Sequence, residues 1–315
     1  MIVETAIAVS ALGFAAGLNS AAYSARVEKA FPREGMVVPV NGRDMHVIAR
    51  GPETAAPVLL IHGASANARE FTSNLAPRLE GDFRVLMADR PGHGWSQRFA
   101  GAERLGAQAA QMAGVLEQVT RGQKAVIAGH SFGGAVALRL ALDRPDLVAG
   151  LVLLAPVTHD WGDGSGTAWY NSFAAAPVAG NVFSQAAPLA GPAQMRSGVA
   201  SVFHPAPAPP DYYETSGVGL FLRPANFRAN ARDMTALKAE LAAQSIRYPE
   251  ITAPVTVFSG SKDRVLSPKL HTARLKKQLK LDLVILPEEG HMPHHGHADA
   301  VASAISRLAI RPETR

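Results

Sequence analysis

One segment limits the folds open to this chain more than any other. Residues 124–134 read KAVIAGHSFGG, in which a short apolar run rich in β-forming residues meets a Gly-x-Ser-x-Gly motif. A helix-forming run follows at once, so the pattern predicts a strand, a sharp turn and a helix. Glycine is needed at Gly129 and Gly133 because a side chain in so tight a turn would collide with the neighbouring strand or helix. The turn would raise the Ser131 hydroxyl above the sheet and direct the N–H of Phe132, at a helix N-terminus, toward whatever that hydroxyl attacks.

Three other strand patterns end in residues that can take part in the same chemistry. The strand VLLI is followed by His-Gly, and the next residue, Ala64, is the expected second backbone donor. The strand VTVF leads into a turn that carries Asp263, and the strand LVIL leads to Gly-His at His291. Since the carboxyl ends of parallel strands meet at one edge of a sheet, we expect these residues and Ser131 to lie together.

These motifs resemble those of the α/β-hydrolase superfamily over residues 35–310. Ser131, Asp263 and His291 each follow a strand in the chain order of the superfamily's catalytic triad. The segment DRPGHGWS at 89–96 is similar to its Asp-x-x-Gly-x-Gly-x-Ser segment. The resemblance implies an α/β fold of the α/β-hydrolase type, with a mostly parallel, doubly wound sheet and an inserted helical cap. It does not specify a substrate.

The order of strand and helix patterns predicts where the domains divide. Strand patterns alternate with helical ones, such as those at 66–79 and 103–120, which is typical of a parallel sheet with helices on both faces. Asn41-Gly42 predicts a two-residue hairpin turn near the start of the sheet. The alternation stops after the sixth strand and resumes later. We therefore expect an N-terminal hydrophobic helix at 1–30, a hydrolase core at 35–157 and 250–315, and a helical cap at 158–249.

The composition agrees with a globular enzyme and narrows its partners. The chain has 315 residues, 47% hydrophobic and 18% charged, which suffices for a sizeable core and argues against disorder. Its net charge of +5 comes without a long Lys/Arg run, so no nucleic-acid partner is expected. The lack of cysteine excludes disulfides, thiolate metal sites and a cysteine nucleophile. The oligomeric state is left open.

The N-terminal stretch allows three interpretations. Residues 5–23 carry no charge and are near the minimum length for one membrane span, although they are rich in Ala and Gly rather than Leu. No basic residue precedes them, whereas Arg26, Lys29 and Arg33 follow, which favours an inner-membrane anchor with the catalytic domain on the cytoplasmic side. The alternatives are a helix docked on a cytoplasmic protein and a cleaved secretory signal. The missing N-terminal positive charge disfavours secretion.

Aromatic residues are concentrated in the expected cap. A small cap needs aromatic side chains for its own core, which accounts for most of them. We expect a few others to line an apolar acyl pocket. The candidates are Trp161, Trp169, Tyr170, Phe173, Tyr212, Tyr213 and Phe221, of which we take Trp161, Trp169 and Tyr212 as substrate-binding residues.

The residue types suggest how the site would react. A serine hydroxyl is a poor nucleophile at neutral pH and needs a base within hydrogen-bond reach, for which His291 is the candidate. Asp263 would hold the histidine in one tautomer and stabilise the imidazolium. The N–H groups of Ala64 and Phe132 would bind the oxyanion, and water would then release the acyl group from Ser131. This chemistry needs no cofactor, and a small-molecule ester is the expected partner.

Several other residues compete for these roles. Three more histidines within 294–297 could form a metal-binding tract, but no partner cluster accompanies them, so no metal site is expected. His291 is preferred as the base because its Gly-His pair directly follows a strand. Asp160 and Asp163 are alternatives to Asp263, since some members of the superfamily place the acid after the sixth strand.

We expect a hydrolase that cleaves a carboxylic ester with a small to medium, apolar acyl group. Haloalkane dehalogenases and epoxide hydrolases of this superfamily use an aspartate where this chain has Ser131, so those activities are disfavoured. The segment GHSFGG also resembles that of carbon–carbon bond hydrolases acting on ring-cleavage products, although their oxyanion loop is typically glycine-rich and this one reads HGASAN. A non-catalytic ligand-binding protein of this fold is a third interpretation, disfavoured because all three triad candidates are present.

Overall fold

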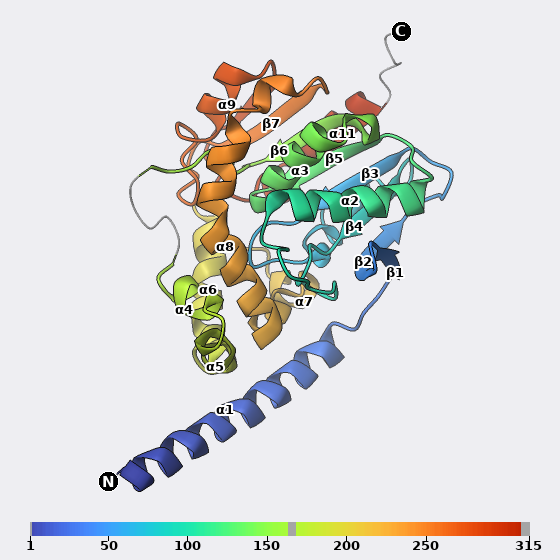
Figure 1. The fold of residues 1–315 in the computed structure, drawn as a ribbon. Helices are drawn as coiled ribbons and strands as arrows, with labels where there is room; N and C mark the ends of the chain where they lie inside the picture. Colours follow the sequence, from blue (N-terminus) through green and yellow to red (C-terminus); the bar gives the residue numbers. More distant parts are fainter. Residues whose placement is uncertain (1, 163–167, 310–315) are drawn as a thin grey trace.

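The structure is a computed structural model that describes residues 2–162 and 168–309. Its strands form one sheet in the order β1-β2-β4-β3-β5-β6-β7-β8 (Figure 1). They are β1 (Met36–Val40), β2 (Arg43–Arg50), β3 (Pro57–Ile61), β4 (Arg84–Ala88), β5 (Ala125–His130), β6 (Val148–Leu154), β7 (Val255–Gly260) and β8 (Asp282–Leu286). Pairing is parallel from β4 to β8 and antiparallel where β2 joins β1 and β4. The mostly parallel sheet is confirmed, as is the hairpin turn, in which Asn41 and Gly42 have φ of 51° and 71°.

The order of the strands determines where a ligand can bind. β3 lies between β4 and β5, so the chain leaves β3 toward one side of the sheet and later continues on the other. Loops that leave two adjacent parallel strands in opposite directions open a crevice at the carboxyl ends of the strands. Ala64 follows β3 and Ser131 follows β5, so both residues lie at this crevice.

Helices cover both faces of the sheet. Apolar side chains of α2 (Leu105–Thr120), α3 (Phe132–Asp143) and α9 (Thr272–Gln278) form one core cluster with the strands. On the other face, α11 (Ala298–Ala309), which follows the short α10 (Pro293–Gly296), forms a second cluster. Because both faces are covered, the central strands are buried on both sides and read as continuous apolar runs.

The helix expected at 66–79 is a wrong prediction. Two short 3-10 turns, η1 (Ala68–Phe71) and η2 (Ala76–Arg78), occupy this segment. The side chain of Asn67 accepts a hydrogen bond from a backbone N–H of η1 and so starts that turn. Pro77 has no N–H to donate and would clash with a carbonyl one turn earlier in a continuous α-helix. The apolar side chains of the segment are nevertheless buried, so the periodicity predicted burial and not the type of helix.

Helices fill the segment that was expected to form a cap. They are α4 (Tyr170–Ala175), α5 (Ala179–Gln185), α6 (Ala187–Phe203), α7 (Tyr212–Thr215), η4 (Val218–Leu222) and α8 (Pro224–Ser245), and we refer to them together as the cap. α8 runs from these helices back to the sheet and its covering helices, where Leu237 and Leu241 join the first core cluster (Figure 1). Asp163, one alternative acid, lies outside the described residues.

α1 (Ile2–Ala30) is a long helix whose second half packs against the cap (Figure 1). Tyr23 and Val27 are buried in a cluster with apolar residues of η4, and the Tyr23 hydroxyl donates to the Gly219 carbonyl (3.0 Å). In the part of the chain that the structure describes, no helix is long and apolar enough to cross a membrane. The span expected at 5–23 is therefore not supported, since small Ala, Gly and Ser side chains give it little hydropathy.

Val27→Asp should release α1 from the cap, because a carboxylate would replace an apolar side chain that is only 8% exposed. We expect the unfolding free energy to fall by about 3 kcal/mol. Trypsin should then cleave after Arg26 and Lys29 faster than in the wild type. Ala25→Asp, on the exposed side of the same turn, is the matched control and should change neither property. Equal resistance of Val27→Asp and wild type to trypsin would show that this contact does not hold α1.

Candidate active site

Ser131 stands on a strained turn between β5 and α3. Its backbone has φ 50° and ψ −113°, a conformation that a residue other than glycine adopts at an energetic cost. The turn is held in part because the Ser131 N–H donates to the Leu154 carbonyl (2.9 Å). A Cβ at Gly129 would lie 2.4 Å from the Gly133 oxygen, and a Cβ at Gly133 would lie 2.1 Å from the last carbonyl oxygen of β3. The motif thus adopts the strand, sharp turn and helix that it predicts, and both glycines are required by close backbone approach.

His291 and Asp263 are brought together by the loops that follow β8 and β7. Nδ1 of His291 lies 2.8 Å from Oδ2 of Asp263, and both side chains are almost fully buried. Oδ1 of Asp263 accepts hydrogen bonds from the N–H groups of Val265 (2.8 Å) and Leu266 (2.9 Å), which hold the carboxylate in place. With Nδ1–H donated to the carboxylate, Nε2 is left to accept a proton. Asp160, the other described alternative, uses its carboxylate to accept a nearby backbone N–H instead.

Ser131 and His291 line the same cavity, but they make no direct hydrogen bond in the described structure. The backbone of His291 is held on both sides, since its N–H donates to the Val202 carbonyl (3.2 Å) and its carbonyl oxygen lies 2.9 Å from Nε2 of His130. Catalytic hydrogen bonds in ligand-free enzymes are often long and tighten when substrate binds. The geometry therefore brings the serine and the histidine–carboxylate pair to one cavity without pairing them.

The loop after β3 is held by a buried histidine and a buried arginine. Nε2 of His62 accepts the N–H of Arg90 (3.0 Å), so the Nδ1–H of His62 donates to the Gly63 carbonyl (2.8 Å). Burial, helped by the charge of Arg90, holds the pKa of His62 well below its ordinary value, which keeps the ring neutral. The Arg90 guanidinium also donates to the carbonyls of His62 and Gly63 (3.2 and 3.1 Å). Ala64, the next residue, lines the cavity, and its N–H makes no hydrogen bond in the described structure.

Arg90 also joins this loop to the serine turn and to the cap. Its guanidinium lies 4.2 Å from the ring centroid of Phe132 and donates to Oδ2 of Asp233 in α8 (2.8 Å). Asp233 is also contacted by Nε2 of His93 (3.0 Å) and by Arg98 (2.6 Å). Burial alone would raise the pKa of Asp233, but the hydrogen bond from His93 and the charges of Arg98 and Arg90 hold it below its ordinary value. Of the residues in this network, the sequence patterns indicated the segment DRPGHGWS and Phe132, but none of the individual contacts.

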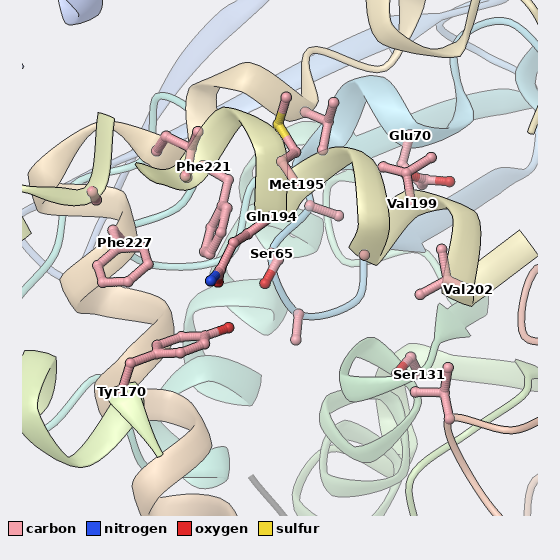
Figure 2. Close-up of a pocket in the computed structure, with 18 of the residues that line it drawn as sticks. Ser65, Glu70, Ser131, Tyr170, Gln194, Met195, Val199, Val202, Phe221 and Phe227 are labelled. Atoms are coloured by element: carbon pink, nitrogen blue, oxygen red, sulfur yellow. The ribbon is translucent and has the colours of Figure 1, made fainter. Parts of the chain in front are cut away.

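The cavity that contains Ser131 has a volume of about 560 Å³ and is lined mainly by apolar side chains. Figure 2 shows Ser131 at one end of this cavity and the aromatic residues Tyr170, Phe221 and Phe227 toward the other. α6 forms the wall between the two ends. The shape suits an elongated apolar group whose reactive end lies at the serine.

The predicted substrate-binding residues occupy different places. Tyr212 is buried and lines the cavity, whereas Trp169 lines it from a position that leaves 70% of the residue exposed. Trp161 does not line the cavity and packs instead against the first core cluster. The other aromatic residues of the wall are two further candidates, Tyr170 and Phe221, and two that were not predicted, Phe183 and Phe227.

A buried carboxylate, Glu70, lies on the cavity wall (Figure 2). Its Oε1 accepts hydrogen bonds from Nε2 of His294 (3.0 Å) and Nε2 of His295 (2.8 Å). Its Oε2 accepts a hydrogen bond from the hydroxyl of Tyr212 (2.9 Å). Burial alone would raise the pKa of Glu70, but the hydrogen bonds from the two histidines hold it below its ordinary value. The ligand atoms of the carboxylate and the two imidazoles lie within 4.8 Å of one another, so Glu70 is a partner for these histidines that the sequence did not indicate. Glu70, which no sequence motif marked, thereby links the cap to the loop that carries His291.

The chain is similar to known proteins in sequence and in fold. The model of the Alpha/beta hydrolase family matches residues 58–304. Lipase LipV of Mycobacterium tuberculosis is 42% identical over 113 residues, which are 36% of this chain and 42% of LipV, so the match spans less than half of that protein. The fold is similar to a thermophilic esterase from Thermogutta terrifontis (TM-score 0.69, 22% identity, 87% of this chain and 97% of the esterase). It is also similar to 2-hydroxy-6-oxo-6-phenylhexa-2,4-dienoate hydrolase from a Rhodococcus species (TM-score 0.69, 22% identity, 86% of this chain and 96% of that one). At such identity the structural matches show a shared fold and not a shared substrate.

The buried histidines predict that the protein loses stability as the pH falls below about 6.5. Burial lowers the pKa of His93, His271 and His294 to about 4. These rings stay neutral in the folded protein at pH values where the unfolded chain already binds protons, so acid favours unfolding. Each ring should lower the unfolding free energy by about 2 kcal/mol at pH 5 relative to pH 7.5, which urea titrations at the two pH values would measure.

His46 opposes this trend and reduces the total loss of unfolding free energy between pH 7.5 and pH 5. Burial alone would lower its pKa, but the hydrogen bond with Asp89, the charge of Asp89 and the hydrogen bond with the Glu34 carbonyl together outweigh burial and raise it. His294→Gln removes one of the acid-sensitive rings and should reduce the difference between the two pH values by about 2 kcal/mol. An unfolding free energy that is the same at both pH values would contradict the assignment of neutral buried rings.

Proposed function

Because the chain belongs to the alpha/beta hydrolase family, we propose that it is a serine hydrolase that cleaves a carboxylic ester with a small to medium, apolar acyl group. The observation that carries the proposal is the hydrogen-bonded pair of His291 and Asp263 at the cavity that also contains Ser131. A serine hydroxyl becomes a nucleophile when a base oriented by a third group lies beside it. The names of LipV, a lipase, and of the Thermogutta enzyme, an esterase, agree with this class.

The proposed reaction has two steps on Ser131. Nε2 of His291 takes the hydroxyl proton as the oxygen attacks the ester carbonyl carbon, and then gives that proton to the leaving alcohol. The acyl group remains on the serine oxygen. Water that loses a proton to His291 attacks this acyl-enzyme, and His291 returns the proton to the Ser131 oxygen as the carboxylic acid leaves. Asp263 holds Nδ1–H and stabilises the imidazolium in both steps.

The N–H groups of Ala64 and Phe132 are the proposed donors to the oxyanion. Neither donates a hydrogen bond within the described ranges, and Phe132 begins α3, where the helix dipole adds positive partial charge. One such donor contributes about 3 kcal/mol to transition-state binding in comparable sites. Arg90 supports both groups, because it donates to the carbonyls beside Ala64 and lies over the Phe132 ring.

Ser131→Ala should abolish labelling by a fluorophosphonate and lower turnover of p-nitrophenyl esters by about 10⁵-fold or more, because the attacking oxygen is gone. Asp263→Asn should lower kcat by about 10⁴-fold, since the amide would favour the wrong tautomer of His291. Melting temperatures of both variants control for folding. Labelling that survives in Ser131→Ala would refute the assignment of the nucleophile.

The same assay separates the other two interpretations. Labelling of the wild type without turnover of any ester would favour hydrolysis of a carbon–carbon bond in a ring-cleavage product. Folded wild-type protein that is not labelled at all would favour a ligand-binding protein without catalysis.

The length of the acyl group should depend on α6, which forms a wall of the cavity. Gly198 lines the cavity, and a Cβ added there would meet no atom within 4 Å, so we expect a larger side chain at this position to enter space that the acyl group would use. Gly198→Leu should reduce kcat/KM for long-chain esters relative to butyrate by about 10-fold or more, while the helix gains slightly in stability. Gly198→Ala is the matched control and should leave the ratio nearly unchanged. A chain-length profile of Gly198→Leu identical to the wild type would place the acyl group elsewhere.

A further inference from the structure

A second cavity, of about 600 Å³, lies between α1 and the cap, and none of its lining residues lines the cavity of Ser131. Its walls come from the second half of α1, the end of α5, the first turns of α8 and the loop that carries Arg98. We call it the α1 cavity. Gly17 and Ala21 leave room for a ligand, and Ser20 and Ser24 contribute hydroxyl groups. Polar groups therefore make up a larger share of the lining here than in the cavity of Ser131.

Arginines dominate the charge of the α1 cavity. Arg98, Arg223, Arg228 and Arg232 line it, whereas Glu28 is its only acidic lining residue. Arg223 pairs with Glu28 (2.9 Å), and Arg98 pairs with carboxylates outside the lining, of which Asp233 is the nearer (2.6 Å). The charges of Arg98 and Arg223 are thus compensated within the protein.

Arg228 and Arg232 are not compensated in this way. They stand one turn apart on α8, and neither forms an ion pair with a carboxylate of the described residues. Arg228 donates to the carbonyls of Ala176 and Pro177 (3.1 and 2.7 Å), while its buried Nε has no hydrogen-bond partner. Burial and the neighbouring charge of Arg232 lower the pKa of Arg228. Like charges at this helical spacing repel, so an anion between them would relieve an unfavourable contact.

We propose that the α1 cavity binds a phosphate group between Arg228 and Arg232, supplied either by a soluble phosphate ester or by a phospholipid headgroup. Guanidinium groups bind phosphate oxygens through paired N–H donors. The hydroxyls of Ser20 and Ser24 provide donors from α1, and the first turn of α8 adds the positive end of a long helix. This many donors suits the several oxygens of a phosphate better than the two of a carboxylate. The bound group would join α1 to the cap.

The first test compares melting temperatures of the full chain in sodium phosphate and in sodium chloride of equal ionic strength. Phosphate at about 10 mM should raise the melting temperature of the wild type by about 2–4 °C. Arg232→Gln should lose this shift, yet melt in chloride at the wild-type temperature or above it, because the repulsion is relieved. Arg196→Gln removes the same charge from an exposed position of the cap and should keep the shift.

Two results would overturn the proposal. One is a wild-type protein that responds equally to phosphate and chloride. The other is an Arg232→Gln variant that melts below the wild type in chloride, which would assign Arg232 a structural role. Ser131→Ala should retain the phosphate shift, so the outcome does not depend on the proposed ester hydrolysis.

Sedimentation with vesicles distinguishes the two sources of phosphate. Wild type that sediments with phosphatidylglycerol vesicles but not with phosphatidylcholine vesicles, and loses this binding in Arg232→Gln but not in Arg196→Gln, would support the headgroup. A phosphate-dependent shift in melting temperature without sedimentation would support a soluble phosphate ester.

Discussion

The buried guanidinium of Arg90 is the group on which the arrangement of the candidate site depends. It is fully buried, and an unpaired charge in that position would cost several kcal/mol. Asp233 of the cap supplies the opposite charge, and the carbonyls of His62 and Gly63 and the side-chain oxygen of Gln108 accept further N–H groups. Since these partners come from the core and from the cap, the guanidinium is satisfied only when both are folded together. The Arg90 guanidinium therefore joins the loop before Ala64 to α8 of the cap.

Neutral imidazoles and one carboxylate connect the other loops of the site. A neutral ring both donates and accepts, so His62 joins two loops without a buried charge. Glu70 has the complementary role, because its two oxygens collect donors from α7 and from the turn that follows His291. The His62 ring and the Glu70 carboxylate are both buried, and burial is also what lowers the pKa of the histidines. The rigidity of the site and its sensitivity to acid thus have the same cause.

The parts of this site that the sequence predicts are those that local geometry determines. The turn at Ser131 follows from its glycines, and the strands that precede Asp263 and His291 are short apolar runs, so their residues could be placed at one edge of the sheet. The contact of Arg90 with Asp233 joins residues 143 positions apart and leaves no periodic signal. Trp161 was misplaced because aromatic content does not tell which face of a cap segment meets the core.

The two cavities share the cap elements that lie between them. In α5, Phe183 lines the cavity of Ser131, while the next residue, Ser184, lines the α1 cavity. In η4, Leu222 lines the first cavity and belongs to the cluster that holds Tyr23 of α1. Close-packed elements transmit displacement because they contain few voids that could absorb it. The position of α1 and the shape of the apolar cavity are therefore coupled through single layers of side chains, so a group that fixes α1 on the cap also fixes one wall of the space available to an acyl chain.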